Sequence, residues 1–429
     1  MLNKTLRFIK RFIPTKLFTA LQPIYHWKLA LLGTLVYRFP SRHIKVVAIT
    51  GTKGKSTTAE LVNAILESAG YTTALLGTIR FKVADTETRN LYKMTIPGRF
   101  FVQKFLRNAV TEKCDWAIIE MTSEGAKQFR HKWIAMDALI FTNLAPEHLE
   151  SHGSFENYRD AKLSVAQQLA HSHKQNTAII ANADDAEALS FLECGANRAF
   201  PFHLSDAKPY SQTSTGYEFG FGGERIHLAI PGLFNVYNAL SAATFAQSQN
   251  IPPQKIKEGL ESVTSVPGRA EFIREGQAFD VVVDYAHTPD SLKSIYEAFS
   301  LSRVVGVLGN TGGGRDTWKR PEMARIAEAS CQHIFLTNED PYDEDPQKIL
   351  EQMAEGIQDT SKLSIILDRR EALHEALVLA QKMATTNPHA RVAVLITGKG
   401  TDPYIMGPNG SKIPWDDATV VREELKKLN

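Results

Sequence analysis

Cysteine is scarce in this chain of 429 residues, where only Cys114, Cys194 and Cys331 occur, far apart from one another. Three widely spaced cysteines form no metal-ligand pattern and suit a reducing compartment. The chain also lacks an excess of charge of one sign, because 49 Lys and Arg residues oppose 47 Asp and Glu residues, for a formal net charge of +2. That balance argues against a nucleic-acid binder driven by bulk charge, and we expect no nucleic-acid partner.

A long hydrophobic run is missing as well. The apolar stretch from Trp27 to Tyr37 has about eleven residues, against the roughly 20 needed to span a bilayer. The residues before it carry a different pattern, in which four apolar residues share one helical face and four basic residues lie largely off it: Leu2, Leu6, Ile9 and Ile13, with Lys4, Arg7, Lys10 and Arg11. This pattern predicts a basic amphipathic helix, which fits an anionic membrane surface or a partner groove. We therefore expect a cytoplasmic protein with peripheral membrane contact through residues 2–16, the alternative being a helix packed on the first domain.

Apolar residues make up 43% of the chain, enough for two or three domains with sizeable cores. Residues 44–266 alternate strand and helix patterns, which predicts a mostly parallel sheet covered on both faces. A second alternating segment follows from about residue 267. We expect strands at 45–50, 73–76, 116–120, 138–143 and 177–181, a small antiparallel excursion at 205–228, and further strands at 280–284, 303–308, 333–336, 363–366 and 391–397. The fold class predicted is α/β, with an N-terminal extension (1–43), a central domain (44–266) and a smaller, Rossmann-like domain (267–429).

The most informative stretch is Gly51-Thr52-Lys53-Gly54-Lys55-Ser56-Thr57, which follows an apolar strand and precedes a helical pattern. Backbone N–H groups of such a loop can surround a phosphate, and the helix N-terminus adds positive potential. Lys55 would contact the β- and γ-phosphates and Ser56 would bind Mg²⁺. The loop is shorter than the usual G-x-x-x-x-G-K-[ST] pattern. The sequence therefore predicts a P-loop ATPase domain, the alternative being an ordinary glycine turn.

Further polar residues follow later strands of the same predicted sheet, where ligands of parallel sheets bind. Glu120 ends an apolar strand and could complete a Mg²⁺ shell, although a strand-end charge in solvent is the plain alternative. His148 and His152 follow the next strand, and Lys162 lies in a helical pattern beyond them. Histidines and lysines at such places are more often structural or solvated.

Together these motifs resemble the Mur ligase family. The likeness begins with the loop and continues with Glu120, Asn143-Leu144 and His148, then Asn157-Tyr158 and Ala161-Lys162. Four later segments continue it: Gly232–Ala239, Pro267–Glu271, Asp284–Pro289 and Gly312–Pro321. Each motif is short, but their order and spacing are specific over roughly residues 44–429.

The resemblance implies a carboxylate-amine ligase that uses ATP and two Mg²⁺ ions and passes through an acyl phosphate. ATP would be held by Gly51, Thr52, Lys53, Gly54, Lys55, Ser56, Thr57, Asn143, Asn235, Arg269 and Asp284. The metal ligands implied are Ser56, Glu120, His148 and Lys162, the last as a carbamate formed with CO₂, because an ammonium cannot bind a cation. Lys55, His148, Lys162 and Arg269 would be the catalytic group. Little of this chemistry needs a protein nucleophile, since charge neutralisation and alignment suffice.

Within the family, the likeness is strongest to the ligases that add the third peptide residue to UDP-MurNAc-L-Ala-D-Glu. Thr95, Ile96, Thr122, Gln128 and Arg130 match the substrate motifs of these ligases, and an arginine suits a carboxylate or phosphate. Expected partners are a UDP-muramyl peptide and an amino acid. The chain differs from the family pattern in having no counterpart of the usual N-terminal UDP-binding domain.

The residues that would receive the amino acid also depart from the family pattern. Diaminopimelate-adding relatives carry Asp-Asn-Pro-Arg, where this chain has Glu339-Asp340-Pro341-Tyr342, and Gly398 to Asp402 is altered too. A tyrosine cannot form a charge-assisted pair with the distal carboxylate, and an acidic surrounding favours an amine. The sequence therefore leans toward L-lysine or another diamine over meso-diaminopimelate. Three rivals stay open: a folylpolyglutamate synthase-like ligase, a non-catalytic ATP-binding membrane scaffold and a generic P-loop kinase.

Overall fold

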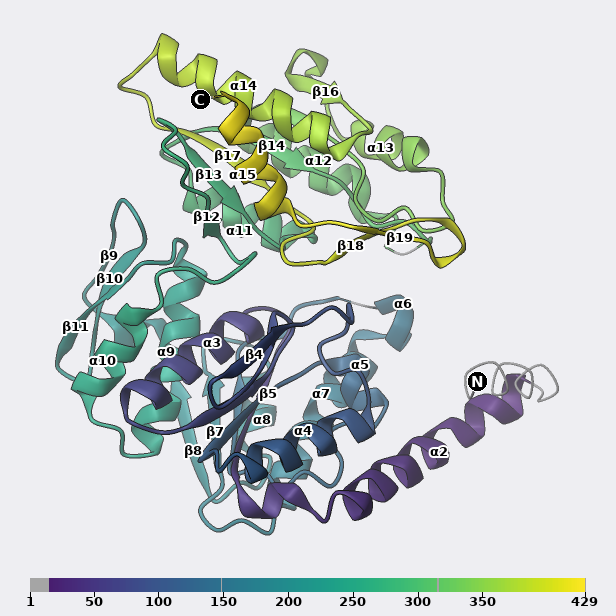
Figure 1. The fold of residues 1–429 in the computed structure, drawn as a ribbon, viewed down its shortest axis with the longest axis vertical. Helices are drawn as coiled ribbons and strands as arrows, with labels where there is room; N and C mark the ends of the chain where they lie inside the picture. The colour runs from purple at the N-terminus through teal and green to yellow at the C-terminus, as the bar shows by residue number, and fades with distance from the viewer. Residues whose placement is uncertain (1–14, 148, 315, 429) are drawn as a thin grey trace. The chain divides into compact units, whose positions relative to one another are not determined.

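A computed structural model describes residues 15–147, 149–314 and 316–428 of the chain (Figure 1). These residues form two compact units. Unit 1 holds the described residues up to 206 and residues 238–259, and unit 2 holds residues 207–237 and 260–428. The division falls within the helices α9 (Leu233–Ser248) and α10 (Pro253–Ser262). The domain boundary that we placed between residues 266 and 267 stays a prediction.

Unit 1 is built on an eight-stranded sheet with the order β4-β3-β2-β5-β1-β6-β7-β8. Its strands are β1 (Lys45–Thr50), β2 (Thr73–Leu76), β3 (Arg80–Val83), β4 (Thr86–Arg89), β5 (Trp116–Met121), β6 (Ala138–Phe141), β7 (Ala178–Asn182) and β8 (Arg198–Phe202). All neighbours pair in parallel except β2 with β3 and β3 with β4. Parallel strands need cover on both faces, which is why the strands near the middle of the sheet are almost continuously apolar. The mostly parallel α/β fold expected from the sequence is confirmed.

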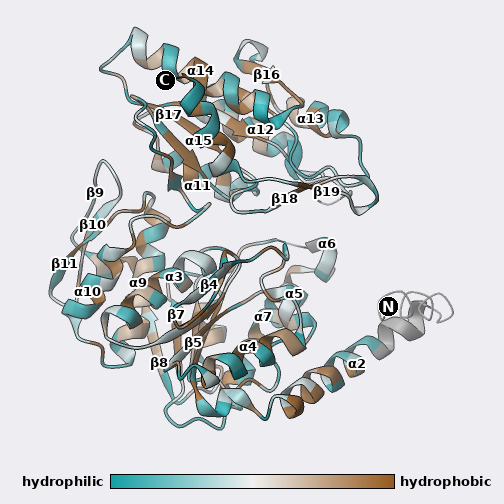
Figure 2. Ribbon diagram, viewed as in Figure 1, coloured by the Kyte–Doolittle hydropathy of each residue, from teal (hydrophilic) through white to brown (hydrophobic). Residues whose placement is uncertain are grey.

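Helices cover this sheet: α3 (Lys55–Ser68), α4 (Arg99–Thr111), α5 (Ser123–Lys127), α6 (Leu149–His152), α7 (Phe155–Ala170) and α8 (Ala188–Leu192). Apolar side chains of α4 and α7, such as Leu106 and Val165, are buried in one cluster with Ile119 of β5 and Leu139 of β6. Figure 2 shows largely hydrophobic strands in this sheet and helices that carry both hydrophilic and hydrophobic residues. This packing leaves the carboxyl ends of β1, β5 and β6 as the place where polar loops gather.

The first described element is α2 (Thr15–Val36), which packs against α4. Its contact face is made of small residues: Ala30, Gly33 and Thr34 are buried, and a Cβ at Gly33 would lie 3.6 Å from the Phe100 Cα. Within the described part of the chain, no helix is long and apolar enough to cross a membrane. The basic amphipathic helix predicted within residues 2–16 falls, except for Thr15 and Lys16, outside the described residues.

Unit 2 contains a six-stranded sheet with the order β12-β13-β17-β14-β15-β16, in which only the β12–β13 pair is antiparallel. The strands are β12 (Glu271–Phe272), β13 (Asp280–Val283), β14 (Arg303–Leu308), β15 (Cys331–Leu336), β16 (Leu363–Ile365) and β17 (Val392–Ile396). One face packs on α11 (Pro289–Ala298), α12 (Lys319–Ser330) and α13 (Pro346–Ala354), and the other on α14 (Arg369–Thr386) and α15 (Asp417–Leu428). Residues of β14 pack on both faces of the sheet. Val304 and Leu308 belong to the apolar cluster with α11, α12 and α13, and Val305 and Val307 belong to the cluster with α14 and α15.

Smaller sheets complete unit 2. The antiparallel excursion expected at 205–228 is confirmed as β9 (Tyr210–Gln212), β10 (Tyr217–Phe221) and β11 (Glu224–Leu228). A two-stranded ribbon, β18 (Tyr404–Met406) with β19 (Lys412–Pro414), follows β17. For the ten strands predicted outside the excursion, the predicted and observed ends are identical or differ by one or two residues.

Candidate active site

The loop between β1 and α3 has the compact shape that its two glycines allow. Gly51 and Gly54 have φ angles of +147° and +82°, and an added Cβ would lie 2.0 Å from Thr142 Oγ1 and 2.1 Å from Asn238 Oδ1, respectively. Any side chain at either position would force the loop away from these neighbours. Helix α3 begins at Lys55 with no side-chain hydrogen bond from its N-cap, and a helix N-terminus suits an anion.

The segment after β6 holds this loop in place. Asn143 accepts hydrogen bonds from Thr52 N at its backbone oxygen (2.8 Å) and from Lys53 N at its Oδ1 (3.0 Å). Thr142 Oγ1 donates to the Lys53 carbonyl at 2.7 Å. Lys55 Nζ folds back to the carbonyls of Gly51 (2.9 Å) and Thr52 (2.8 Å). The predicted phosphate-binding residues are therefore brought together with Asn143.

Glu120 lies at the end of β5 beside the first turn of α3. It is 1% exposed, and its Oε2 accepts from Ser56 Oγ at 2.9 Å and from Thr78 Oγ1 at 3.0 Å. Thr78 N donates to Oε1 at 2.8 Å, so Thr78 fixes both carboxylate oxygens. Among residues 15–147, 149–314 and 316–428, no group of three or more His, Cys, Asp or Glu side chains could hold a metal ion. The carboxylate and hydroxyl of Glu120 and Ser56 nevertheless fit Mg²⁺, which takes oxygen ligands, keeps several waters and binds substrate phosphates.

Lys162 of α7 approaches the same loop from the other side. Its side chain is buried, and Nζ donates to the Gly51 carbonyl at 2.6 Å and lies 4.8 Å from the Tyr158 ring centroid. Tyr158 in turn bonds through its hydroxyl to Thr52 Oγ1 at 2.9 Å. Burial lowers the pKa of the Lys162 ammonium well below its usual value, the Lys55 charge lowers it further, and Glu147 acts in the opposite direction. His148, the predicted companion of Lys162, lies outside the described residues.

The residues predicted to contact the acceptor also gather in unit 1. Arg130, 8% exposed, donates through Nη1 to the Ile96 carbonyl and through Nη2 to Gln128 Oε1 at 2.8 Å. Thr95 Oγ1 is 2.8 Å from Thr78 Oγ1, which joins the acceptor motif to Glu120. Thr122 caps α5 by accepting from Gly125 N at 3.0 Å.

In unit 2, the predicted nucleotide residues lie near the start of the six-stranded sheet or just before it. Arg269 Nη1 donates to the Gly268 carbonyl at 2.9 Å, and its guanidinium carbon stands 4.5 Å from the Tyr285 ring centroid. Asp284 accepts from the backbone N–H groups of Ala270 and Ala286, both at 2.7 Å. Desolvation raises the pKa of Asp284, against the effect of Arg269. Asn235 Nδ2 donates to the Pro231 carbonyl at 2.7 Å.

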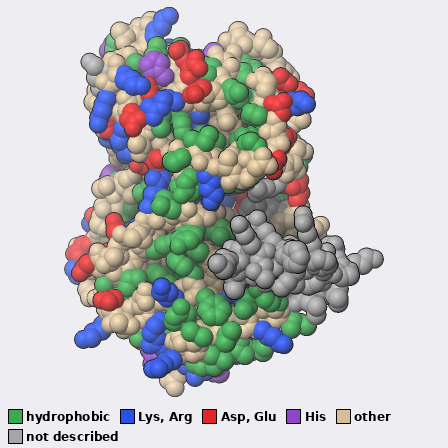
Figure 3. Space-filling view, turned by 45° about the vertical axis from the view of Figure 1, so that its right-hand side comes forward, with side chains coloured by type: hydrophobic (Ala, Val, Ile, Leu, Met, Phe, Trp, Pro, Cys, Tyr) green, Lys and Arg blue, Asp and Glu red, His purple; other side chains and the backbone are tan. Residues whose placement is uncertain are grey.

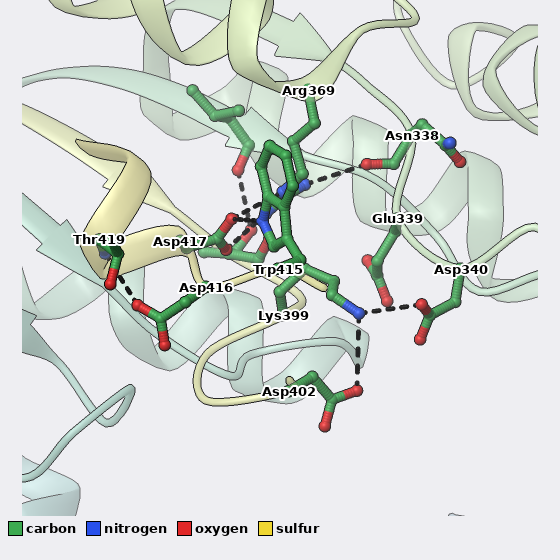
Figure 4. Close-up of polar contacts among 12 residues, drawn as sticks. Asn338, Glu339, Asp340, Arg369, Lys399, Asp402, Trp415, Asp416, Asp417 and Thr419 are labelled. Atoms are coloured by element: carbon green, nitrogen blue, oxygen red, sulfur yellow. Dashed lines mark hydrogen bonds and ion pairs between the residues drawn. The ribbon is translucent and has the colours of Figure 1, made fainter. Parts of the chain in front are cut away.

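The residues predicted to receive the amino acid form a buried charged cluster (Figure 4). Lys399 Nζ donates to Asp340 Oδ1 at 2.9 Å and lies 3.7 Å from Asp402 Oδ2. Lys399 therefore neutralises part of the acidity that the sequence indicated here. Glu339 is 3% exposed, with Oε1 accepting from Thr311 Oγ1 at 2.9 Å and Oε2 without a hydrogen-bond partner among the described residues.

The backbone of Gly398 lies close to the Glu339 carboxylate of this cluster. A Cβ at Gly398 would lie 2.2 Å from Glu339 Oε2, so only glycine leaves room for that carboxylate. Tyr342 has a φ of +53° and donates its backbone N–H to the Met406 carbonyl at 3.0 Å, which ties it to β18. Nearby, Arg369 and Asp417 form a fully buried bidentate pair, 2.8 and 2.7 Å, that anchors the start of α15.

Sequence reasoning assigned no role to four residues that shape the site: Thr78, Thr142, Asn238 and Lys399. Asn238 and Lys399 lie inside motifs that the resemblance had already singled out, and Thr142 directly precedes the Asn143-Leu144 motif, so these positions could have found them. Thr78 carries no such signal, because a single threonine after a short strand is unremarkable in a sequence.

Two family models match the chain. The model of the Mur ligase middle domain matches residues 49–246, and that of the Mur ligase glutamate ligase domain matches residues 268–400. Among curated proteins, a UDP-N-acetylmuramoyl-L-alanyl-D-glutamate–2,6-diaminopimelate ligase of Syntrophomonas wolfei is 35% identical over 412 residues, covering 93% of this chain and 81% of that protein. A ligase of the same name from Clostridium acetobutylicum is 33% identical over 415 residues, covering 93% and 82%.

Solved structures are similar as well. One of a UDP-N-acetylmuramoyl-L-alanyl-D-glutamate–2,6-diaminopimelate ligase has a TM-score of 0.62 and 25% identity, over 92% of this chain and 82% of that one. Folylpolyglutamate synthase of Mycobacterium tuberculosis gives 0.68 with 17% identity, over 86% and 91%. The second likeness concerns the fold alone.

Proposed function

Because this chain belongs to the Mur ligase family, we propose that it adds an amino acid to UDP-MurNAc-L-Ala-D-Glu or a related muramyl peptide. It is an ATP-dependent amide ligase of peptidoglycan synthesis, as the family match and the curated relatives establish. The observation that supports a muramyl-peptide acceptor is the series of hydrogen bonds from Thr95 through Thr78 to Glu120 and Ser56. That series connects the motif predicted to bind the peptide with the residues predicted to bind MgATP.

The proposed reaction has two steps. An acceptor carboxylate oxygen attacks the γ-phosphorus of ATP, which forms an acyl phosphate and releases ADP. The nitrogen of the incoming amino acid then attacks the acyl carbon, a proton leaves the nitrogen, and phosphate departs from the tetrahedral intermediate. Lys55 and the N-terminus of α3 would stabilise the charge on the transferred phosphoryl group. Mg²⁺, which this family uses, would be held by Ser56 and Glu120 and would supply further charge neutralisation.

We propose that Lys162 works as a carbamate. Only a neutral amine reacts with CO₂, and burial beside Lys55 favours the neutral form of Lys162. The carbamate would present two oxygens and a negative charge where the Lys162 amine now contacts the Gly51 carbonyl. With His148, it would provide ligands for a second Mg²⁺.

For the amino acid, we propose L-lysine or another diamine. The relatives are named for 2,6-diaminopimelate. By resemblance to the family pattern, however, Tyr342 stands where diaminopimelate-adding ligases have an arginine. The buried Glu339 oxygen without a partner supports an ammonium at this place, because an unpaired buried carboxylate is costly. Asp340 contributes less, since Lys399 already neutralises it.

Mass spectrometry of the product tests the proposal directly. The full chain is supplied with ATP, Mg²⁺, UDP-MurNAc-L-Ala-D-Glu and an equimolar mixture of amino acids. We expect a tripeptide product whose mass corresponds to added lysine or another diamine. A product carrying only meso-diaminopimelate would overturn the choice of amine, and ADP release with a folate or without any muramyl product would overturn the acceptor.

We also propose a cytoplasmic location with contact to the inner face of the membrane through residues 2–16. Residues 1–44 hold eight Lys and Arg residues and no Asp or Glu, which suits an anionic surface. Within this stretch, helix α2 has five apolar residues whose relative exposure is about half: Ile24, Tyr25, Leu32, Leu35 and Val36. Figure 3 shows hydrophobic side chains gathered on the lower part of the molecule.

Co-sedimentation with anionic vesicles tests this proposal. Binding should be strong for the full chain and lost on deletion of residues 2–38, and unchanged binding would contradict the proposal.

A further inference from the structure

Within the described part of the chain, three nitrogen atoms without hydrogen-bond partners lie on neighbouring cationic or ionisable side chains of unit 1. They are His26 Nδ1 of α2, Arg99 Nη2 of α4 and Arg130 Nε of the segment after α5, all buried from solvent. Unpaired buried donors are rare in folded proteins, because each costs about 1–3 kcal/mol. Two arginine donors and a histidine nitrogen without partners, close to one another, would suit a ligand with acceptor atoms.

The packing of α2 brings these side chains together. Gly33 of α2 lies against the start of α4, where its Cβ position is 3.7 Å from the Arg99 carbonyl oxygen. Trp27 meets Trp133 edge to face, with ring centroids 5.5 Å apart, which pins α2 to the segment that carries Arg130. His26 precedes Trp27 and lies two helical turns before Gly33, on the face that meets α4.

Both guanidinium groups are bound to the same residue. Arg99 Nε donates to the Gln128 carbonyl at 2.7 Å, and Arg130 Nη2 donates to Gln128 Oε1 at 2.8 Å. Two arginines that share one neutral anchor repel each other unless an anion lies between them. In keeping with this, burial and then the Arg130 charge lower the pKa of Arg99 to about 10.

The other charged groups facing the cluster do not supply that anion. Glu124 of α5 accepts from Gln128 Nε2 at 2.8 Å and from Ser151 Oγ at 3.1 Å. Burial and the two arginines lower the pKa of His26 to about 4, with Glu124 acting weakly in the opposite direction, so His26 is neutral at pH 7. Its ring can donate one hydrogen bond in that form. The N-terminus of α4, which begins at Arg99 without a side-chain cap, adds positive potential.

We propose that His26, Arg99 and Arg130 form an anion site for a phosphate group of the acceptor. This inference rests on the proposed function, because the site adjoins Ile96 and Gln128, which belong to the acceptor motif. A phosphate fits better than a carboxylate, since its tetrahedral oxygens can meet donors arriving from three elements. The same chemistry would serve a phosphate carried by a nucleoside diphosphate or by a lipid diphosphate.

The kinetic test removes one charge and changes the acceptor. Arg99→Gln is compared with Lys104→Gln, which removes the same charge from an exposed position on α4, and with Arg99→Lys, which restores the charge. The KM is measured for UDP-linked, lipid-diphosphate-linked and phosphate-free MurNAc-L-Ala-D-Glu. Loss of a hydrogen bond to a charged partner should raise the KM of Arg99→Gln for a phosphate-bearing acceptor about tenfold or more.

The phosphate-free acceptor and the KM for ATP should be unaffected, Lys104→Gln should behave as the wild type, and Arg99→Lys should recover part of the loss. A KM increase with only one phosphate-bearing acceptor supports the site and identifies the carrier. The proposal is overturned if Arg99→Gln changes no KM, or changes the KM of the phosphate-free acceptor equally.

A second measurement keeps the site testable if no muramyl acceptor is turned over. Inorganic pyrophosphate is titrated into the full chain in the presence of saturating MgADP, which occupies the loop at 51–54. Tryptophan fluorescence is followed, because Trp27 and Trp133 adjoin the site. A saturable change that is lost in Arg99→Gln and His26→Gln but kept in Lys104→Gln supports the anion site independently of the acceptor. Identical titrations for all four proteins would refute it.

Discussion

Replacing Thr78 by valine tests whether the placement of Glu120 controls the reaction. Valine has the same shape but lacks the hydroxyl that donates to Glu120 Oε2 at 3.0 Å and contacts Thr95 Oγ1 at 2.8 Å. The backbone bond from Thr78 N to Oε1 is kept. Loss of one hydrogen bond to a carboxylate costs about 2 kcal/mol, which corresponds to roughly 30-fold.

We expect this cost to appear in the magnesium dependence of the rate. The Mg²⁺ concentration for half-maximal rate should rise roughly 10- to 30-fold in Thr78→Val, because a carboxylate that is no longer aligned is a poorer ligand. Thr78→Ser keeps the hydroxyl and should behave nearly as the wild type. Thr86→Val, on the exposed strand β4, is the matched control. The reasoning is refuted if Thr78→Val has the wild-type magnesium dependence, or if Thr86→Val shifts it as much.

Three further outcomes are expected. Lys162→Ala should lower the rate of amide formation on the order of 100-fold, and added short carboxylic acids should restore part of it. A fully active variant would contradict both the carbamate and an enzymatic role for this side chain. Tyr342→Arg should raise kcat/KM for meso-diaminopimelate relative to L-lysine by about tenfold or more, since it restores a charge-assisted pair, and an unchanged ratio in a competition assay would argue against our choice of amine. Burial lowers the pKa of His131 to about 3. Between about pH 6.5 and pH 3, this histidine is therefore protonated in the unfolded chain but not in the folded one. The free energy of unfolding should fall by up to about 4 kcal/mol as the pH drops through that window. Urea unfolding at pH 7 and pH 4.5 checks this, and His131→Gln should lose part of that pH dependence.

Local patterns in the sequence predicted the elements whose residues carry their own signal. The apolar run of β1 and the Gly51–Ser56 loop placed the turn between β1 and α3 correctly, because strand, glycines and helix occur in unbroken succession. Hairpin β3–β4 was not predicted, since Thr86–Arg89 is polar and exposed and shows no apolar alternation. Its existence depends on pairing with β2 and not on its own composition.

Contacts between distant residues were the part that could not be predicted. The bonds that seat the loop join residues about 90 positions apart, as with Thr142 and Lys53, and nothing local marks their partners. Likewise, the sequence showed acidic residues around Asp340 but not that Lys399 lies among them. The ion-pair partner of a charged residue is determined by tertiary contacts, so it cannot be read from the neighbouring sequence.

Strand β4 also bears on how the protein behaves at high concentration. It is the last strand at one end of the eight-stranded sheet, and every residue of its sequence Thr-Glu-Thr-Arg is exposed. An open strand edge is a template on which another chain can add, and apolar edges start aggregation in this way. Here a carboxylate and a guanidinium would have to shed their water before a second strand could dock. The edge therefore protects unit 1 against self-association through strand addition.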